Sequence, residues 1–438
     1  MKDQTGQETG KRTGVRWSML FLVMMVMCIN YLDRANLSVA APVIGKELEL
    51  SPATMGILFS AFGWMYTCML PFAGAALDKM GPRVLLTISL IGWSAFTAVI
   101  GAVSSLTALL ACRVGVGFFE SPVLPTNVRC VTAWFPAKER ALSVGLYTSM
   151  QYISLGLLTP FLAWILVTFG WQAIFYITGG IGVFAGVIWH VYYRDPHDST
   201  TVNQAELDYI RAGGGLAESG TEKKIPFSWR KVRQLLSHRQ IWGMFIGQFA
   251  VMTILFFFLT WFPTYLINGK GLTILKGGFF AAVPFLVAII GALLGGWWSD
   301  WMVKKGYSNS VARKTPIIVG FSLAATIVAA NYTEDITWVI IFMAIAFFGQ
   351  AVASTVTGAL LSDMAPKGLV GLTGGMLYFI ANIGGTTAPL VIGYVVQQTG
   401  GFNMALAYVS AVAACGVFAY LVVMGKVSRI EIQEEADG

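Results

Sequence analysis

Residues 17–41 form one apolar run, Trp-Ser-Met-Leu-Phe-Leu-Val-Met-Met-Val-Met-Cys-Ile-Asn-Tyr-Leu-Asp-Arg-Ala-Asn-Leu-Ser-Val-Ala-Ala, whose only charged residues are Asp33 and Arg34. About 20 consecutive apolar residues in a helix span the hydrocarbon core of a bilayer, so this run is long enough to cross a membrane. An acid and a base inside such a run are costly to bury and mark a candidate functional position. The run therefore predicts a transmembrane helix with polar chemistry inside it.

Eleven more runs of this kind follow along the chain, each bounded by charged or turn residues. Of the 438 residues, 56% are hydrophobic and 12% are charged, whereas an ordinary soluble domain carries about 25% charged residues. This composition excludes a water-soluble enzyme and predicts an all-α membrane protein with twelve transmembrane helices. We expect the helices at 17–41, 53–77, 84–104, 106–129, 141–168, 172–193, 240–267, 275–302, 315–331, 337–362, 372–398 and 402–425.

The distribution of positive charge predicts the orientation of these helices. Of the 29 Lys and Arg residues, Arg34 and Arg113 lie deep within runs. Alternate connections between runs lie on the same side of the membrane, and one set of them, with the run ends beside it, holds only Lys46, Lys270 and Lys276. The remaining 24, with Arg129 counted at a helix end, lie on the other side together with both termini. Connections rich in Lys and Arg stay in the cytoplasm. We therefore expect both termini to be cytoplasmic. The net charge of +7 is then a topology signal, and nucleic acid is not an expected partner.

The longest polar stretch, residues 194–239, separates two sets of six runs. It predicts an N-terminal half at 1–193, a cytoplasmic linker and a C-terminal half at 240–438. Within the linker, Thr201 to Gln204 resemble a capping box that opens a short helix at 205–211, which glycines from Gly213 onwards would end.

The two halves repeat short patterns at nearly constant offsets. Gly74 to Asp78 match Gly296 to Asp300, and the pair Tyr147 and Gln151 matches Tyr378 and Asn382. Carriers built from repeated halves bind their substrate near the middle of the membrane and expose it alternately to each side. A solute carrier with two pseudo-symmetric six-helix halves is therefore the leading interpretation.

Asp33 and Arg34 are the strongest candidates for transport chemistry. Adjacent helical residues diverge by about 100°, so we expect their partners on other helices or in a cavity. The alternative is that the two charges neutralise each other in a purely structural pair. Tyr31 and Arg34 share a helix face, where a phenol and a planar guanidinium can bind a carboxylate and hydroxyl groups. This arrangement fits a polyhydroxy acid as substrate.

Glu120 is the other deeply placed acid, and Arg113 lies two turns earlier on the same face. Burial disfavours the charged form of a carboxyl, so Glu120 can exchange protons near neutral pH and is a candidate for proton coupling. The alternative is a permanent structural tether between Arg113 and Glu120. We expect Arg113 itself to be structural. Pro122 can break the helix beside the acid.

Further polar residues in the runs are candidates for lining a central site. Tyr147 and Gln151 form an i,i+4 pair on one face, as do Tyr378 and Asn382 in the matching place of the other half. Tyr66 and Gln248 can join them, although hydrogen bonds between helices explain a membrane Tyr or Gln equally well. Substrate contacts are therefore predicted for Tyr66, Gln151, Gln248, Tyr378 and Asn382, beside Tyr31 and Arg34.

The connection at 74–83 places an acid and two bases at the cytoplasmic edge, namely Asp78, Lys79 and Arg83. Such an acid can pair with a base in one state of a carrier and release it in the other. Asp300 repeats the acid in the second half. We expect this set to act in gating.

Cysteine and histidine give little support for enzymatic chemistry. The five cysteines lie singly in apolar runs, and the three histidines lie at a helix end or in the linker. No nucleophile and base pair or metal cluster is indicated, so no metal, no cofactor and no enzyme activity are expected.

These residues resemble the major facilitator superfamily, whose Gly-x-x-x-Asp-Arg/Lys-x-Gly-x-Arg motif is met by Gly74, Asp78, Lys79, Gly81 and Arg83. Other segments resemble the anion:cation symporters of that superfamily, above all bacterial proton-coupled carriers of sugar acids such as D-galactonate and glucarate. They are Asn30 to Leu37, Phe119 to Asn127, Trp134 to Pro136, Thr260 to Pro263 and, in the linker, Ala205 to Arg211 and Gly213 to Leu216. One departure from the galactonate carriers lies at Gly374 to Tyr378, with Asn382 a turn later, so the particular sugar acid stays open.

The resemblance implies that Asp33 and Glu120 bind the coupled protons and that Arg34 meets the substrate carboxylate. It also implies that Tyr31, Tyr66 and Gln151 surround the hydroxyl groups of the substrate. We therefore predict a monomeric proton symporter that imports a sugar-acid anion across the bacterial cytoplasmic membrane by alternating access. The alternatives are a proton-driven exporter of small organic compounds and a receptor that binds a sugar acid without transporting it.

Overall fold

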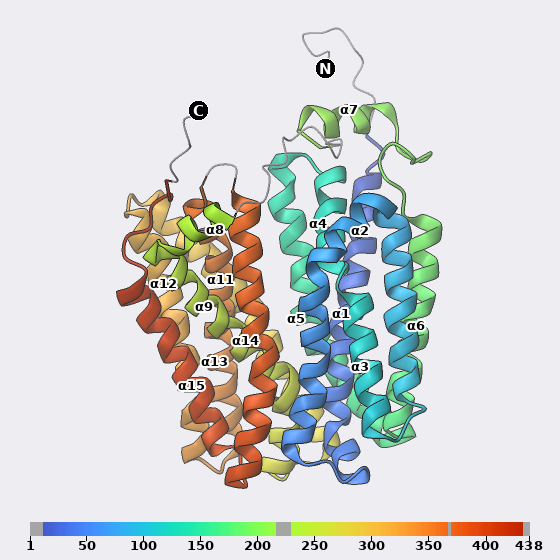
Figure 1. The fold of residues 1–438 in the computed structure, drawn as a ribbon, viewed down its shortest axis with the longest axis vertical. Coiled ribbons are helices and arrows are strands. Elements are labelled where there is room, and N and C mark those ends of the chain that lie inside the picture. Colours follow the sequence, from blue (N-terminus) through green and yellow to red (C-terminus); the bar gives the residue numbers. More distant parts are fainter. Residues whose placement is uncertain (1–11, 216–228, 367–368, 432–438) are drawn as a thin grey trace. The chain divides into compact units, whose positions relative to one another are not determined.

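The computed structural model describes residues 12–215, 229–366 and 369–431, and every regular element in them is helical (Figure 1). The α-helices are α1 Val15–Glu47, α2 Pro52–Ile100, α3 Leu106–Glu120, α4 Val123–Trp134, α5 Ala137–Phe169, α6 Trp171–Tyr192, α7 Gln204–Ala212, α8 Trp229–Leu236, α9 Arg239–Phe256, α10 Phe262–Thr264, α11 Ile274–Lys304, α12 Asn309–Ala325, α13 Ile336–Met364, α14 Val370–Thr399 and α15 Asn403–Phe418. Shorter helical segments of other types are η1 Phe257–Trp261, η2 Tyr265–Gly269, η3 Thr326–Tyr332 and η4 Ala419–Val423.

The described residues contain eleven helical segments that are long and apolar enough to cross a membrane. One of them, α2, bends at Gly81, where φ is 70° and ψ is 164°. Glycine adopts this positive φ without the steric strain of a Cβ atom. The bend separates two helical parts, 52–80 and 82–100, each of which is long enough to span the hydrocarbon core. The all-α fold with twelve crossings is therefore confirmed.

The predicted helix at 106–129 is divided in the structure. α3 ends at Glu120 and α4 begins at Val123, with Ser121 and Pro122 between them. Because proline has no backbone N–H, it cannot continue the hydrogen-bond ladder of α3. The break predicted beside Glu120 is present, and it places the acid at the last residue of a helix.

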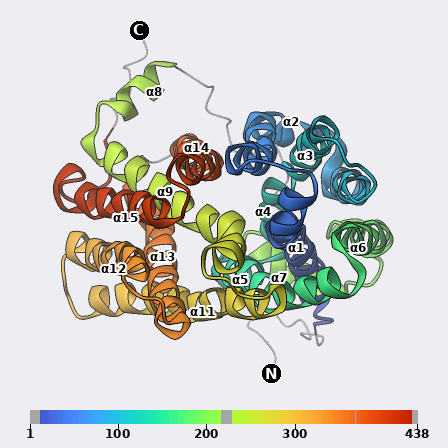
Figure 2. The same cartoon turned by 90° about the horizontal axis from the view of Figure 1, so that it is seen from below.

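Contacts between residues divide the described chain into two compact units. Unit 1 contains residues 12–33, 68–154 and 172–215, and unit 2 contains residues 34–67, 155–171, 229–366 and 369–431. Within unit 2, α13 packs against α9, α11 and α12, as the view along the helix axes shows (Figure 2). The boundary between the units passes through α1, between Asp33 and Arg34.

The short linker helix predicted at 205–211 is present as α7, but its capping residue was predicted incorrectly. Asn203, and not Thr201, is the N-cap, and Asn203 Oδ1 accepts a hydrogen bond from the Glu206 backbone N–H at 3.0 Å. An Asn side chain reaches the N–H group three residues on from the extended backbone conformation that Asn203 adopts. Gly213 ends the helix as predicted.

Candidate functional site

Helix α1 carries Asp33 and Arg34 at consecutive positions inside a membrane-spanning segment. Asp33 is buried, with 4% of its surface exposed, and Arg34 is half-buried. Consecutive helical residues point about 100° apart, so each side chain meets its own neighbours. The structure gives Asp33 a contact within unit 1 and gives Arg34 contacts within unit 2.

The carboxylate of Asp33 is bonded to an indole. Trp93 Nε1–H, on the second part of α2, donates a hydrogen bond to Asp33 Oδ2 at 2.8 Å, and Trp93 is fully buried. Sequence reasoning missed this residue, because one tryptophan in an apolar run carries no sign of a polar partner. A buried carboxylate requires hydrogen-bond donors, so the buried Asp33 was itself the only signal to search for one.

The guanidinium of Arg34 lies against two aromatic rings of the first part of α2. Its central carbon is 5.0 Å from the ring centroid of Phe62 and 5.2 Å from that of Tyr66. The two rings are one helical turn apart, with centroids 5.6 Å from each other. Cation–π contacts of this kind hold a guanidinium in place while its N–H groups can still donate to a ligand. Tyr66 was predicted as a substrate contact and not as a partner of Arg34. Phe62 was not predicted at all, although its i,i+4 spacing to Tyr66 places both on one face.

Glu120 and Arg113 are both buried in α3, with 0% and 6% of their surfaces exposed. They lie on the same face of this helix, seven residues apart. Tyr31, one turn before Arg34 in α1, is buried as well. The structure thus places the predicted acids, Asp33 and Glu120, in the interior of unit 1.

The remaining predicted substrate contacts differ in burial. Tyr147 is buried and Gln151 half-buried in α5, and Gln248 is buried in α9. The buried oxygen of Gln248, Oε1, accepts no hydrogen bond from any residue that the structure describes. On α14, Asn382 Nδ2–H donates to the backbone oxygen of Tyr378 at 2.8 Å. Among these residues, Gln248 is the one with an unused buried acceptor.

The residues predicted to act in gating lie at helix ends. Asp78 and Lys79 are exposed just before the Gly81 bend, and Arg83 Nε–H donates to the backbone oxygen of His190 at 2.8 Å, at the end of α6. Asp300 Oδ1 lies 3.1 Å from Arg313 Nη1.

Arg313 also binds a second acid, since its Nε lies 2.8 Å from Asp363 Oδ2. Arg313 and Asp363 were not predicted from the sequence, because they lie on α12 and α13 and share no local motif with Asp300.

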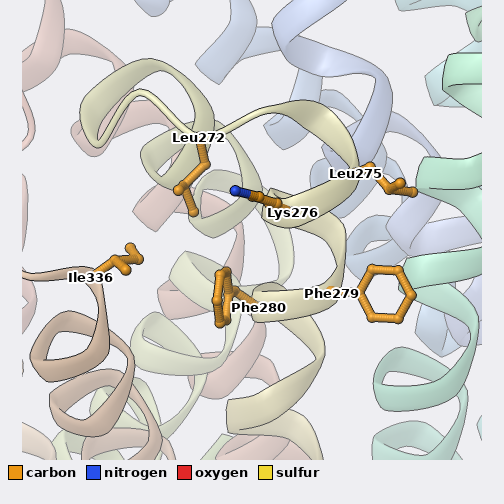
Figure 3. A pocket seen from close by; sticks show the side chains of 6 residues that line it. All are labelled: Leu272, Leu275, Lys276, Phe279, Phe280 and Ile336. Carbon is orange, nitrogen blue, oxygen red and sulfur yellow. The ribbon is translucent and has the colours of Figure 1, made fainter.

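A hollow of about 350 Å³ lies near the start of α11, lined by Leu272, Leu275, Lys276, Phe279, Phe280 and Ile336. Figure 3 shows Lys276 extending between Leu272 and Phe280, while Leu275 and Phe279 point to another side of the helix. The lining is apolar apart from Lys276, and it contains none of the predicted site residues.

In the described part of the chain, no three His, Cys, Asp or Glu side chains are grouped to hold a metal ion.

Comparisons with known proteins identify the family. The chain matches the family model of the Major Facilitator Superfamily over residues 23–330. It is 46% identical to the D-galactonate transporter of Escherichia coli O6:H1, over 95% of this chain and 97% of that protein. It is also 39% identical to a probable galactarate/D-glucarate transporter of Escherichia coli K12, over 99% of this chain and 98% of that protein.

Among solved structures, a bacterial homologue of the human lysosomal transporter Spinster, in an inward-facing and unoccupied conformation, has a TM-score of 0.72 to this chain. The sequence identity is 18%, and the match covers 94% of this chain and 95% of that one. The chain is therefore a multi-pass membrane protein with the transporter fold, and it belongs to the Major Facilitator Superfamily. The resemblance to the major facilitator superfamily inferred from the sequence is therefore confirmed. The relatives of the chain are transporters and not enzymes.

Proposed function

We propose that this protein imports a sugar-acid anion by proton symport with alternating access. The substrate is a hexonate such as D-galactonate, or a related aldarate or uronate. The names of its relatives, a D-galactonate transporter and probable galactarate/D-glucarate transporters, support this substrate class. The bacterial origin of these relatives supports a bacterial cytoplasmic membrane as the location. We also propose that both termini lie in the cytoplasm and that the protein is a monomer.

The observation that carries the proposal is Arg34 in the membrane-spanning part of α1, steadied by the rings of Phe62 and Tyr66. A guanidinium is always charged, and its fork of N–H groups matches the two oxygens of a carboxylate. Arg34 is therefore assigned to the substrate carboxylate. The hydroxyl groups of the sugar acid are assigned to Gln248 Oε1, which lacks a described donor, and to Tyr31, Tyr66, Gln151, Tyr378 and Asn382.

Asp33 and Glu120 are assigned to the coupled protons, because both carboxyls are buried in membrane-spanning helices. Protons from outside neutralise them, the anion binds at Arg34, and the halves 1–193 and 240–438 rock to expose the site to the cytoplasm. Both ligands must bias the same conformational equilibrium for transport to be coupled. Arg113 is assigned a structural role. Gating at the cytoplasmic edge is assigned to Asp78, Lys79, Arg83 and Asp300.

The substrate class is tested by the thermal stability of purified protein mixed with aldonates, aldarates, uronates and lipophilic cations. A ligand that binds the folded state raises the unfolding temperature. We expect a rise with a sugar acid in the wild type and none in Arg34→Ala. Lys276→Ala, which removes a cation from the apolar hollow, is the control and should keep the wild-type response. Stabilisation by lipophilic cations alone would favour an exporter.

Proton coupling is tested in vesicles that contain the purified protein and an imposed pH gradient. Glu120→Gln and Asp33→Asn should each abolish uphill accumulation of D-galactonate, while Glu120→Gln should retain exchange of labelled for unlabelled substrate. Undiminished uphill uptake by either variant would refute the proton role of that residue. Binding without any uptake by the wild type would indicate a receptor.

A further inference from the structure

The second part of α2, which carries Trp93, is held tightly on one side by α6. A Cβ atom added at Gly179 would lie 2.7 Å from the backbone oxygen of Ser94, and one added at Gly186 would lie 2.8 Å from Ile91 Cγ1. Small residues on one helix let two membrane helices approach this closely. The backbone on both sides of Trp93 is therefore fixed against α6.

The same part of α2 is also held by α3. A Cβ atom added at Gly92 would collide with the ring of Phe119, and one added at Gly115 would lie 2.6 Å from the ring of Phe96. The rings of Phe96 and Phe119 stack with centroids 5.9 Å apart. With α6 and α3 packed on it, α2 presents the indole of Trp93 to Asp33 in a defined place.

The bond between Trp93 and Asp33 favours one protonation state of the acid. An indole N–H can only donate, and an ionised carboxylate can only accept. A donor to the charged form stabilises that form and weakens proton binding. Both side chains are almost fully buried, where little water competes with the bond.

We propose that Trp93 is a positioning residue that makes the proton on Asp33 releasable. This inference rests on the proposed proton role of Asp33. Burial disfavours the charged form of a carboxyl. The indole N–H offsets part of that penalty and fixes the carboxylate for each transport cycle.

Helix α1 itself and helices α3 and α5 of the bundle carry further charged and titratable groups, and these stay unchanged in the comparison below. They are Tyr31 and Arg34 on α1, Arg113 and Glu120 on α3, and Tyr147 and Tyr152 on α5.

The test is the pH dependence of D-galactonate uptake by Trp93→Phe, which keeps an aromatic ring and removes the donor. Uptake falls on the alkaline side as the coupling acid loses its proton. Without the indole donor, Asp33 holds its proton to higher pH, so we expect the alkaline midpoint to rise by about one pH unit, equivalent to about tenfold tighter proton binding.

Trp189→Phe is the matched control. Trp189 is equally buried in unit 1, and its Nε1–H has no acceptor among the described residues. Its replacement should leave the midpoint unchanged. An unchanged midpoint in Trp93→Phe, or a shift that Trp189→Phe shares, would overturn the inference.

A second pair of variants keeps the test decisive if Trp93→Phe folds poorly. Trp93→Gln and Trp93→Leu both lose the ring, but only Gln keeps an N–H donor, so only Leu should raise the midpoint. Equal midpoints in the two variants would also overturn the inference. The two proposals fail separately. Uphill uptake by Asp33→Asn would refute the proton role of Asp33 itself. Loss of uphill uptake in Asp33→Asn, together with a wild-type midpoint in Trp93→Phe, would refute only the role of Trp93.

Discussion

Glu206 Oε1 lies 2.8 Å from Arg16 Nη1, and both side chains are buried. The same carboxylate accepts hydrogen bonds from the backbone N–H groups of Val15 at 3.0 Å and of Arg16 at 3.3 Å. These N–H groups belong to the first turn of α1, where backbone N–H groups have no acceptor within the helix itself. An acid of the linker helix α7 thus caps the first membrane helix, and its negative charge suits that helix end.

Glu206→Ala should destabilise the protein by about 3 kcal/mol, because it leaves the buried guanidinium of Arg16 without its main partner. The estimate is at the low end for a buried ion pair, since Arg16 Nε also lies 3.1 Å from Glu139 Oε2. Thermal unfolding followed by circular dichroism in detergent measures the loss. Asp208→Ala is the control on the same helix, where the exposed pair with Arg211 at 4.0 Å contributes less than about 1 kcal/mol. Equal losses in both variants would contradict the capping role.

The same acid predicts a dependence of stability on pH. Burial raises the pKa of Glu206, but hydrogen bonds from Thr13, from the Arg16 side chain and from the backbone of Val15 and Arg16 outweigh it, so the pKa lies below its ordinary value. Because its pKa is lower in the folded state, ionised Glu206 stabilises the folded protein at pH values above the unfolded-state pKa of about 4.3. This contribution to stability is lost as the pH falls through the folded-state pKa.

Wild-type unfolding temperature should therefore drop on acidification below about pH 4.3, and Glu206→Gln should lack this part of the drop. Matched melting curves between neutral and acidic pH give the comparison. Parallel curves for both proteins would show that other acids cause the decline.

Sequence reasoning found the fold because burial in a membrane is a local property of each apolar run. Asp33, Arg34 and Glu120 could be singled out as candidates, because an ionisable residue stands out against apolar neighbours. Their roles in transport stay predictions. The partners of these groups were harder to find. Trp93 and Phe62 look like any other aromatic residue of a run, and only the packing of α2 against α1 shows which of them meets a charge.

The capping box was assigned to Thr201, since a serine or threonine in that motif is as good a candidate as the asparagine that follows it.

Pairs that are distant in the sequence were also missed. The contact of Glu206 with Arg16 joins residues far apart in the chain, and neither residue carries a local mark of its partner. The same holds for Arg313 and Asp363.

Asp363→Asn should destabilise the protein more than Asp300→Asn does. Both acids bind Arg313, but the side chain of Asp363 is 26% exposed and that of Asp300 is 65% exposed. A hydrogen bond to a charged group that is partly shielded from water contributes about 1.5 kcal/mol or more, whereas an exposed ion pair contributes less than about 1 kcal/mol. Unfolding temperatures of the two variants give the comparison, and the reverse order would contradict this ranking.

Gly393→Ala should destabilise unit 2 by about 1–3 kcal/mol through overpacking. A Cβ atom at Gly393 on α14 would lie 2.5 Å from the backbone oxygen of Pro52 and 3.0 Å from the ring of Trp261. Backbone atoms cannot rotate away as a side chain can. Gly375→Ala, on the same helix but with no atom within 4 Å of the added Cβ, should be neutral or stabilising by up to about 1 kcal/mol. Similar unfolding temperatures for the two variants would show that α14 shifts at no cost.

Phe62→Leu should weaken sugar-acid binding by about two- to fivefold, because it removes one of the two rings that hold the Arg34 guanidinium, a contact worth about 0.5–1 kcal/mol. Tyr66→Phe keeps the second ring and removes only the hydroxyl, so any loss of affinity there reports a hydrogen bond to the substrate. Titration calorimetry of the purified variants with D-galactonate measures both effects.

Phe59→Leu is the control for the ring of Phe62. Phe59 lies one turn earlier on α2, is equally buried and contacts Trp261 at 5.4 Å between centroids. Its loss should leave the affinity unchanged, because Trp261 carries no charge to orient a carboxylate. If Phe59→Leu weakened binding as much as Phe62→Leu, the effect would come from helix packing and Arg34 would not depend on its aromatic neighbours.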